Sequence, residues 1–407
     1  MAATADFVVI GGGVVGAAIL HELTERGLGG ILLERDLPNR QGSGTTAGNL
    51  HIQAIHAERP DQEIAVDTRQ LVPLQARTSE LWRSLQDGFE TPLDISVKGG
   101  LTVAETPAQV AHLREKAAWE AEAGIPTSVI SGDEARARVP QLGAAVLAAT
   151  WCEWDGWANN LVITPAYLDA ARRGGAKVRT HSPVIGMHRL ASGWRVSTPT
   201  GDIDTPVVVD AAGPWMDRIA ELAGFPLLMA PLAIQMLETV RVAPVLEHLI
   251  QHIGEGLSVK QVSTGNVVIG GGWPAAHFDL QGVSPVSSQS VDGSLDQVRR
   301  VLPGLTGIRL SRAWTGPLAA TPDEMPVIGE MPGDSGFHVA GGTYAFTFSP
   351  LWARITADNV LGTTALGTTA LGTTRDATHG TTPATTPDID VSRFAPARLL
   401  ATTPIGL

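Results

Sequence analysis

The stretch FVVIGGGVVGAAILHELTERGLGGILLE, residues 7–34, decides how the rest of the chain is interpreted. It begins with a short apolar run, passes through three glycines into a pattern typical of a helix, and ends in a second apolar run. Gly11, Gly13 and Gly16 have the spacing G-x-G-x-x-G. Such glycines permit a tight turn, a close approach of backbone to a pyrophosphate, and close packing of helix on strand. The stretch therefore predicts a strand, turn, helix and strand that together bind a dinucleotide.

The second apolar run ends on an acidic residue. Glu34 follows the first glycine by 34 − 11 = 23 residues, near the spacing of about 20 at which a carboxylate binds ribose hydroxyls. A carboxylate there also disfavours a ribose 2′-phosphate. A glycine-rich turn can occur without any cofactor, but the strand before it, the helix after it and the acidic terminus are all present here. The pattern predicts a dinucleotide and leaves NAD and FAD both open.

The composition of the whole chain limits the classes of protein to which it can belong. With 407 residues, of which 43% are hydrophobic, it can bury a large core, and we expect two domains. The formal net charge of −12 argues against nucleic acid or a membrane as partner, and no apolar run approaches the roughly 18 residues of a spanning helix. The glycine motif begins too close to Met1 for a cleavable signal peptide, so we expect a cytoplasmic location. One cysteine, Cys152, excludes a disulfide framework and a cysteine-rich metal site, and no metal is expected.

Hydrophobic periodicity and turn residues predict the remaining elements. We expect helices at 107–122, 165–173 and 350–361, the second of them with proline in its first turn. Strands are expected at 184–188, 207–209, 230–242, 257–262 and 267–270. The repeat LGTTA-LGTTA-LGTTR begins at Leu361 and continues into a segment rich in threonine and proline. This composition cannot build a core, so 362–387 is interpreted as a flexible surface insertion without a catalytic role.

Further motifs follow the glycine turn along the chain. They are SGTTAG at 43–48, DAAGPW at 210–215, WTG at 314–316, TPD at 321–323, PVIG at 326–329 and GG at 341–342. With the turn, they resemble the D-amino-acid-oxidase/glycine-oxidase superfamily of FAD enzymes over about residues 6–361. Within it, AGNLHIQ at 47–53 and VKQ at 259–261 are similar to motifs of glycine-oxidase-like, opine-oxidase-like and cyanide-synthase-like amine oxidoreductases.

The resemblance implies an α/β fold. A Rossmann-like FAD-binding domain would be interleaved with an α+β substrate domain built on an antiparallel sheet. The FAD-binding domain would be discontinuous and comprise 1–80, 145–225, 311–361 and 388–407. The substrate domain would comprise 81–144 and 226–310.

The resemblance also implies which residues surround FAD. The glycine turn, Glu34 and the strand at Val184 would hold the adenine half, Gly213 would pass close to the pyrophosphate, and 342–347 would lie along the isoalloxazine. The closing helix would direct its N-terminus at the pyrimidine carbonyl, where its dipole stabilises the anion of reduced flavin. The full expected set is Gly11, Gly13, Val14, Val15, Gly16, Glu34, Arg35, Thr45, Thr46, Gly48, Asn49, Leu50, Val184, Ala212, Gly213, Trp215, Gly316, Gly342, Thr343, Tyr344, Ala345, Phe346 and Thr347.

The substrate end departs from the glycine-oxidase pattern. Where those enzymes have a carboxylate-binding arginine shortly after WTG, this chain has Leu318, and the assisting tyrosine falls at Ser258. Strand alternation puts Lys260 on the same face as Ser258, where it is either a point charge for a carboxylate or a surface lysine. No catalytic acid or base is assigned, because a neutral amine is already a competent donor. The substrate-binding candidates are Asn49, His51, Ser258, Lys260 and Tyr344; for His51 a structural role is the alternative.

The missing arginine argues against free glycine as substrate. It favours a larger secondary amine, such as an N-carboxymethyl amino acid, an opine or an imino acid. The amine would be oxidised to an imine that hydrolyses, releasing glyoxylate from an N-carboxymethyl group, while O₂ is reduced to hydrogen peroxide. An apolar wall for such a substrate, or else plain sheet core, is expected from Met229, Leu232, Ile234, Met236 and Leu237.

Gly316 stands where monomeric sarcosine oxidases carry the cysteine that binds flavin covalently, so non-covalent FAD is expected. Two alternatives stay open from the sequence. One is a subunit of a multi-component opine or imino-acid dehydrogenase, and the other is an NAD-dependent dehydrogenase. A homo-oligomer is compatible with the sequence, which names neither the substrate nor the final electron acceptor.

Overall fold

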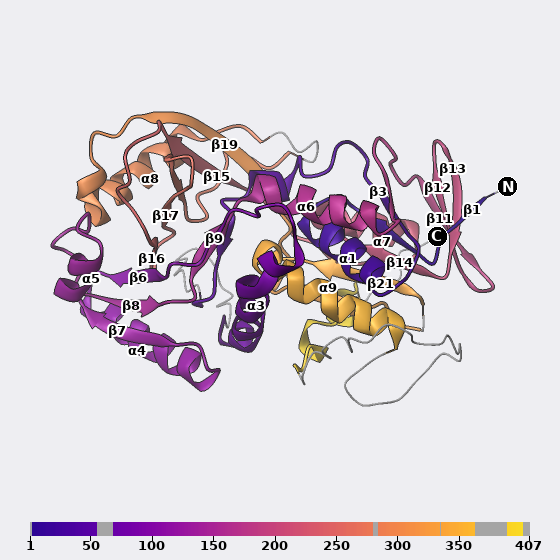
Figure 1. Ribbon diagram of the computed structural model, residues 1–407, viewed down its shortest axis with the longest axis horizontal. Coiled ribbons are helices and arrows are strands. Elements are labelled where there is room, and N and C mark those ends of the chain that lie inside the picture. Colours follow the sequence, from indigo (N-terminus) through magenta and orange to yellow (C-terminus); the bar gives the residue numbers. More distant parts are fainter. Residues whose placement is uncertain (1, 55–67, 280–283, 334, 363–388, 402–407) are drawn as a thin grey trace.

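The computed structural model describes residues 2–54, 68–279, 284–333, 335–362 and 389–401 (Figure 1). Apart from Gly362, the expected insertion at 362–387 lies outside these residues. The described chain forms four sheets, and two of them carry most of the buried apolar side chains. Among the described residues, no helix is both long and apolar enough to span a bilayer.

A six-stranded sheet carries the glycine motif. Its strand order is β10 (Lys177–Arg179), β3 (Gly30–Leu33), β2 (Phe7–Ile10), β14 (Val207–Asp210), β21 (Phe337–Gly341) and β20 (Val327–Glu330). Neighbours pair in parallel except β20, which is antiparallel to β21. Every residue of β2, β3 and β21 is buried, as expected of parallel strands covered on both faces.

Helices cover one face of this sheet and a second sheet covers the other. On the first face α1 (Val14–Glu25) packs between α6 (Asn160–Arg173) and α9 (Ala345–Leu361), and α9 also contacts α3 (Val72–Ser84). On the other face lie α7 (Met216–Leu222) and a four-stranded sheet of β1 (Ala3–Thr4), β13 (Gly201–Thr205), β12 (Gly193–Thr198) and β11 (Gly186–Leu190). The turns after β2, β3, β14 and β21 therefore converge at one uncovered edge, where such sheets bind ligands.

An eight-stranded sheet forms the other side of the molecule (Figure 1). Its order is β19 (Leu310–Leu318), β15 (Leu232–Thr239), β18 (Val267–Gly270), β17 (Ser258–Gln261), β16 (Leu249–His252), β6 (Gly100–Ala104), β8 (Ala148–Cys152) and β7 (Thr127–Ser131). All neighbours are antiparallel except β16 and β6. It packs with α4 (Pro107–Glu122), α5 (Gly132–Arg138) and α8 (Ser288–Val301).

A small sheet joins these two parts. It consists of β4 (Asn49–Leu50), β9 (Gly156–Ala158) and β5 (Ile95–Ser96). The short helix α2 (Gly42–Thr45) lies beside β19. The expected division assigned 145–225 and 311–361 to the FAD-binding domain, but β8 and most of β19 pair within the eight-stranded sheet. The domain boundaries stay a proposal.

The helix α4 matches its predicted range, whereas α6 and α9 begin five residues earlier than predicted. The prediction for 165–173 took Pro165 as part of the first turn, but Pro165 lies inside α6, and Pro350 likewise lies inside α9. In α9, the carbonyl of Phe346, left without its usual partner by Pro350, accepts a hydrogen bond of 2.9 Å from Ser349 Oγ. The strand β16 was not predicted, because LIQH shows no apolar run.

Candidate active site

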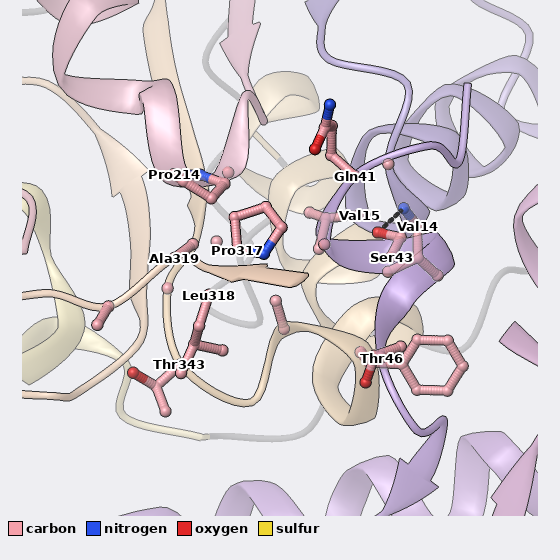
Figure 2. Close-up of a pocket in the computed structure, with 18 of the residues that line it drawn as sticks. Val14, Val15, Gln41, Ser43, Thr46, Pro214, Pro317, Leu318, Ala319 and Thr343 are labelled. Atoms are coloured by element: carbon pink, nitrogen blue, oxygen red, sulfur yellow. Dashed lines mark hydrogen bonds between the residues drawn. The ribbon is translucent and has the colours of Figure 1, made fainter. Parts of the chain in front are cut away.

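A large cavity, with a volume of about 770 Å³, runs along the edge where the sheet turns converge and reaches the eight-stranded sheet. Its walls include the glycine turn, the start of α9 and one face of β15. Figure 2 shows Val14 and Ser43 at the start of α1 on one side of it, with Pro317, Leu318 and Thr343 across from them. The cavity is long enough to pass from the nucleotide-binding edge to the substrate-domain sheet.

The glycine turn is closed by contacts that leave no room for side chains. Gly11 has φ 109°, and a Cβ there would lie 2.5 Å from the carbonyl oxygen of Ala211. At Gly16 a Cβ would lie 2.1 Å from the oxygen of Gly11, so helix and turn touch directly. Ser43 Oγ accepts a hydrogen bond of 2.8 Å from the backbone N–H of Val14, which caps α1 from a distant segment.

Glu34 ties the turn to the second strand. Its carboxylate accepts hydrogen bonds from the N–H of Gly12 at 2.7 Å and of Asp36 at 2.9 Å, and it lines the cavity. The next residue, Arg35, places its guanidinium 3.8 Å from the ring centre of Trp215. At Gly213, which has φ 60°, a Cβ would meet no atom within 4 Å, so the backbone there faces open space. These features fit a dinucleotide: a side-chain-free turn, a carboxylate at the ribose spacing and an open backbone cradle.

Most of the expected FAD-binding residues line this cavity. They are Gly11, Gly13, Val14, Val15, Glu34, Arg35, Thr46, Asn49, Val184, Ala212, Gly213, Trp215 and all six residues from Gly342 to Thr347. Five others lie behind the wall and pack the residues that form it: Gly16, Thr45, Gly48, Leu50 and Gly316. Val184 precedes β11 instead of lying in a strand, because the strand begins at Gly186.

The first turn of α9 is pre-shaped at the cavity. Gly342 has φ 90° and Tyr344, the residue before the helix, has φ 62°, so two nearby left-handed positions turn the backbone sharply. Thr347 is fixed from behind, because its carbonyl oxygen accepts hydrogen bonds from Trp82 Nε1 at 2.7 Å and Thr78 Oγ1 at 2.9 Å. A helix of 17 residues thus directs its positive end into the cavity, where it favours an anion.

Four of the five substrate-binding candidates line the cavity, and Lys260 does not. Lys260 is 1% exposed, so the expectation of a surface lysine is wrong. Its ammonium donates to Asn49 Oδ1 at 2.7 Å and to the carbonyl of Ala47. It also lies 5.7 Å from the ring centre of Trp157. Burial lowers the pKa of Lys260 well below its usual value. The lysine therefore orients Asn49 from behind the wall.

His51 is held beside a residue that sequence reasoning missed. Its Nδ1 lies 2.8 Å from Oε1 of Gln251, which belongs to β16 and also lines the cavity. Burial lowers the pKa of His51 to about 4; the hydrogen bond to Gln251 opposes this shift, and the charge of Lys260 adds to it. The ring meets the Tyr344 ring edge-on, with 6.3 Å between centres. His51 is accordingly a neutral hydrogen-bonding group.

The substrate-domain wall of the cavity is largely apolar. Leu232, Ile234 and Met236 of β15 face it, as does Leu318 of β19. Of the other two residues considered for this wall, Leu237 packs in the core of the eight-stranded sheet and Met229 packs against the core beside β14. Among the described residues, the cations on the cavity wall are Arg35, Arg40 and Arg218, which follow β3 or belong to α7. Arg312 of β19 pairs with Glu238 and does not line the cavity, so no described arginine of β15 or β19 stands where the resemblance implies a carboxylate-binding one.

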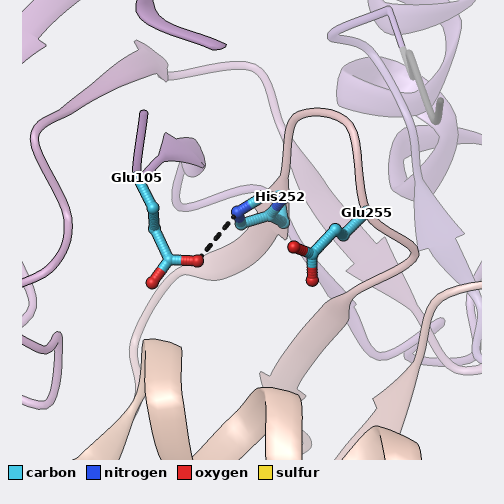
Figure 3. A group of neighbouring side chains, drawn as sticks. All are labelled: Glu105, His252 and Glu255. Carbon is cyan, nitrogen blue, oxygen red and sulfur yellow. Dashed lines mark hydrogen bonds and ion pairs between the residues drawn. The ribbon is translucent and has the colours of Figure 1, made fainter. Parts of the chain in front are cut away.

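Three ionisable side chains, Glu105, His252 and Glu255, gather in one cluster (Figure 3), and two of them, His252 and Glu255, line the cavity. His252 Nε2 lies 3.2 Å from a carboxylate oxygen of Glu105, and Glu255 is close by. Arg300 makes ion pairs with both Glu105 and Glu255. The cluster is therefore an ion-pair network whose cation is the guanidinium. Sequence spacing offered no signal for it, because Glu105 and Arg300 lie far along the chain from His252 and Glu255.

The lone cysteine has no part in the site. Cys152 is fully buried in β8 and does not line the cavity. Burial raises the pKa of its thiol to about 12, so the thiolate that covalent chemistry requires is disfavoured. At Gly316 a Cβ would lie 1.9 Å from Thr45 Oγ1, which leaves no room there for a side chain.

Comparison with known proteins identifies the family. The family model of FAD-dependent oxidoreductases, DAO, matches residues 6–359. The glycine oxidase of Geobacillus kaustophilus is 26% identical over 359 residues, which cover 87% of this chain and 92% of that protein. One of the subunits of the opine oxidase of Rhizobium meliloti is 24% identical, with 79% and 84% covered. The solved structure of L-proline dehydrogenase from P. horikoshii superposes with a TM-score of 0.79 at 25% identity, covering 90% of this chain and 96% of the other.

The family decides between the two cofactors that the glycine motif left open, and the cofactor is FAD. It also agrees with the mixed architecture described above, in which a parallel nucleotide-binding sheet adjoins an antiparallel one. The chain belongs to the DAO family of FAD-dependent oxidoreductases.

Proposed function

We propose that the protein oxidises a carboxylated secondary amine of the N-carboxymethyl amino acid class. The carbon next to nitrogen loses a hydride equivalent, the resulting imine hydrolyses, and glyoxylate is released while O₂ becomes hydrogen peroxide. The observation that carries this proposal is the wall of Leu232, Ile234, Met236 and Leu318, which replaces a carboxylate fork with apolar surface. Such a wall holds a substrate larger than glycine.

FAD would be held by the residues that already fit a dinucleotide. The glycine turn and α1 would bind the pyrophosphate, Glu34 the ribose, and the loop from Gly342 to Thr347 the isoalloxazine. When bound, FAD accepts the hydride equivalent and so supplies the redox chemistry. The tight contact at Gly316 and the burial of Cys152 favour non-covalent attachment.

The protein's own contribution is to bind and orient the amine. Asn49, Ser258 and Gln251 offer neutral hydrogen-bonding groups on the cavity wall. Because Lys260 donates to Asn49 Oδ1, the Asn49 amide can present its N–H groups to a carboxylate. The names of two relatives agree with a secondary amine: proline is one, and opines contain one. The apolar wall would limit the access of water to the reacting carbon.

A second candidate is a component of a multi-component dehydrogenase that passes its electrons to another protein. The similarity to the opine oxidase chain of Rhizobium meliloti favours it, since that protein is named as one part of an assembly. In this case O₂ would reoxidise the flavin slowly. A homo-oligomer is compatible with either proposal.

One experiment separates the two. The purified single chain, loaded with FAD, is mixed with a panel of N-carboxymethyl amino acids, opines, proline and glycine, and hydrogen peroxide and glyoxylate are measured in air. Rapid release of both from an N-carboxymethyl amino acid supports the oxidase. Anaerobic bleaching of flavin absorption near about 450 nm without peroxide in air supports the multi-component dehydrogenase. Glycine as the best substrate, or no bleaching with any amine, contradicts the proposed substrate class. Acid precipitation that leaves all flavin in solution checks non-covalent binding.

A further inference from the structure

His51 presents one defined hydrogen-bonding atom to the cavity. Its Nδ1 lies 2.8 Å from Oε1 of Gln251, and an amide oxygen can only accept. The proton is therefore on Nδ1, and Nε2 is left with a lone pair. Among the described residues, no hydrogen-bond partner faces Nε2, and His51 lines the cavity. The open atom is an acceptor.

Contacts on three sides fix this acceptor in place. The backbone N–H of His51 donates to Thr347 Oγ1 at 3.3 Å, and the carbonyl of His51 accepts from Gln75 Nε2 at 3.2 Å. Its ring rests edge-on against Tyr344 at the start of α9. The acceptor thus lies beside the loop expected to contact the isoalloxazine, and His51 contacts β16 through Gln251. A side chain that is already held in its binding orientation loses little conformational entropy when a ligand binds to it.

The group is suited to accept a hydrogen bond and unsuited to remove a proton. Burial lowers the pKa of His51 to about 4, whereas an aliphatic ammonium ionises at about 10. A proton transfer across that gap is strongly unfavourable, so His51 would not deprotonate the substrate. It remains neutral wherever the amine is neutral, and it can then receive an amine N–H.

We propose that His51 Nε2, positioned by Gln251, accepts the single N–H of a neutral secondary amine and thereby selects secondary over tertiary amines. The inference rests on the proposed function and adds the group that recognises nitrogen. With N–H in this hydrogen bond, the nitrogen lone pair forms the C=N bond as the C–H electron pair passes to oxidised FAD. The amine would lose two electrons to bound FAD, and its N–H bond would stay intact on the iminium product.

A tertiary amine offers no N–H. Its extra alkyl group would cover a lone pair that has no other donor among the described residues, and the unmade hydrogen bond would reduce kcat/KM by about tenfold or more. A primary amine would satisfy Nε2 with one N–H and leave its second N–H to find another acceptor. The geometry therefore predicts a preference for substrates with one N–H.

The test compares iminodiacetate with N-methyliminodiacetate, or the best secondary amine of the panel with its N-methyl derivative. We expect the FAD-loaded wild type to prefer the secondary amine at least tenfold in kcat/KM. His51→Phe, which keeps a ring but removes the acceptor, should bring this ratio close to one. His188→Phe, at an exposed position of β11 in the four-stranded sheet, is the matched control and should keep the wild-type ratio.

A second variant separates hydrogen bonding from space. Gln251→Glu preserves the shape but draws a proton onto both imidazole nitrogens, so that Nε2 becomes a donor. The preference should fall in this variant too, which a simple methyl clash would not explain. An unchanged ratio in either His51→Phe or Gln251→Glu, or a wild type without preference, overturns the inference. Failure of the wild type to oxidise any amine is a different result and refutes the proposed function itself.

Discussion

The ammonium of Lys260 lies 2.7 Å from Oδ1 of Asn49, on the side of Asn49 that faces away from the cavity. Among the described residues no carboxylate pairs with Lys260, although the side chain is 1% exposed. A buried cation without a counter-ion costs stability. An anion bound on the cavity side of Asn49 would offset this cost. The positive end of α9 points to the same place. Both features favour an anion at the same wall.

Lys260→Met should therefore separate stability from binding. Methionine fills a similar volume without a charge, so we expect a melting temperature equal to or above that of the wild type. Without its donor, Asn49 no longer holds its amide toward the cavity, and the Michaelis constant for a carboxylated amine should rise about five- to tenfold. Steady-state kinetics with iminodiacetate measures this rise. An unchanged Michaelis constant would remove Lys260 from the substrate site.

Asp155 should give the protein a pH-dependent stability. It is fully buried, and its carboxylate accepts hydrogen bonds from the N–H of Ile52 and of Gln53, each at 3.0 Å. Burial raises its pKa from 3.8 to about 6, against these hydrogen bonds. Between these two values the folded state binds more protons than the unfolded state, so the contribution of Asp155 to stability falls as pH rises. The full change is on the order of 3 kcal/mol.

Thermal unfolding of the wild type and Asp155→Asn between pH 4 and 7 tests this sign. The difference in stability between the two proteins should shift in favour of the variant as pH rises, because the amide does not titrate. Asp169→Asn, at an exposed position of α6, should run parallel to the wild type. Parallel curves for wild type and Asp155→Asn would contradict the assignment.

Local motifs could be predicted from the sequence, whereas contacts between distant segments could not. The glycine turn and Glu34 lie within one strand–helix–strand unit, so their spacing alone indicated their geometry. Strand alternation explains why Leu232, Ile234 and Met236 line the cavity, but the sequence grouped them with Leu237, which packs in the core. Gln251 was not predicted, because its strand, LIQH, has no apolar pattern and its partner His51 is 200 residues away.

The surroundings of Lys260 are a second example of a contact between distant segments that the sequence could not predict. Alternation correctly grouped it with Ser258 on one strand of the sheet, yet the sequence could not show that Ala47 and Asn49 would occupy its ammonium. The side chain was expected either to bind substrate or to face water. It does not face water, and its ammonium contacts Ala47 and Asn49, which line the cavity in its place. Such a position depends on how two sheets meet, and no single segment encodes it.

Glu34→Ala should weaken FAD binding without unfolding the protein. The change leaves the N–H groups of Gly12 and Asp36 without their acceptor and removes the carboxylate expected at the ribose. Losses of this kind cost about 1–3 kcal/mol, so the dissociation constant should rise about 10- to 100-fold. Quenching of flavin fluorescence on titration of the apoprotein measures it. Glu25→Ala, at an exposed position of the same motif, serves as control and should bind FAD normally. Equal affinities would show that Glu34 only shapes the turn.

Gly316→Ala should disturb the cavity from behind its wall. An added Cβ would lie 1.9 Å from Thr45 Oγ1 and 2.5 Å from Thr45 Cβ, so α2 must move. Trp314 holds the same segment through a hydrogen bond of 2.8 Å from its Nε1 to the carbonyl of Thr45, which limits that movement. Overpacking of this kind costs about 1–3 kcal/mol. Because Ser43 in α2 caps α1 at the glycine turn, part of the cost should appear as weaker FAD binding.

The double variant Gly316→Ala with Thr45→Gly tests the cause, since it removes every Thr45 atom that the new methyl group would meet. We expect it to recover melting temperature and FAD affinity relative to Gly316→Ala, apart from the smaller cost of a glycine in α2. Thr45→Ala in place of Thr45→Gly should rescue less, because its Cβ remains 2.5 Å from the added methyl. If Gly316→Ala alone behaves like the wild type, the strand has room at this position, and the steric argument for non-covalent flavin fails with it.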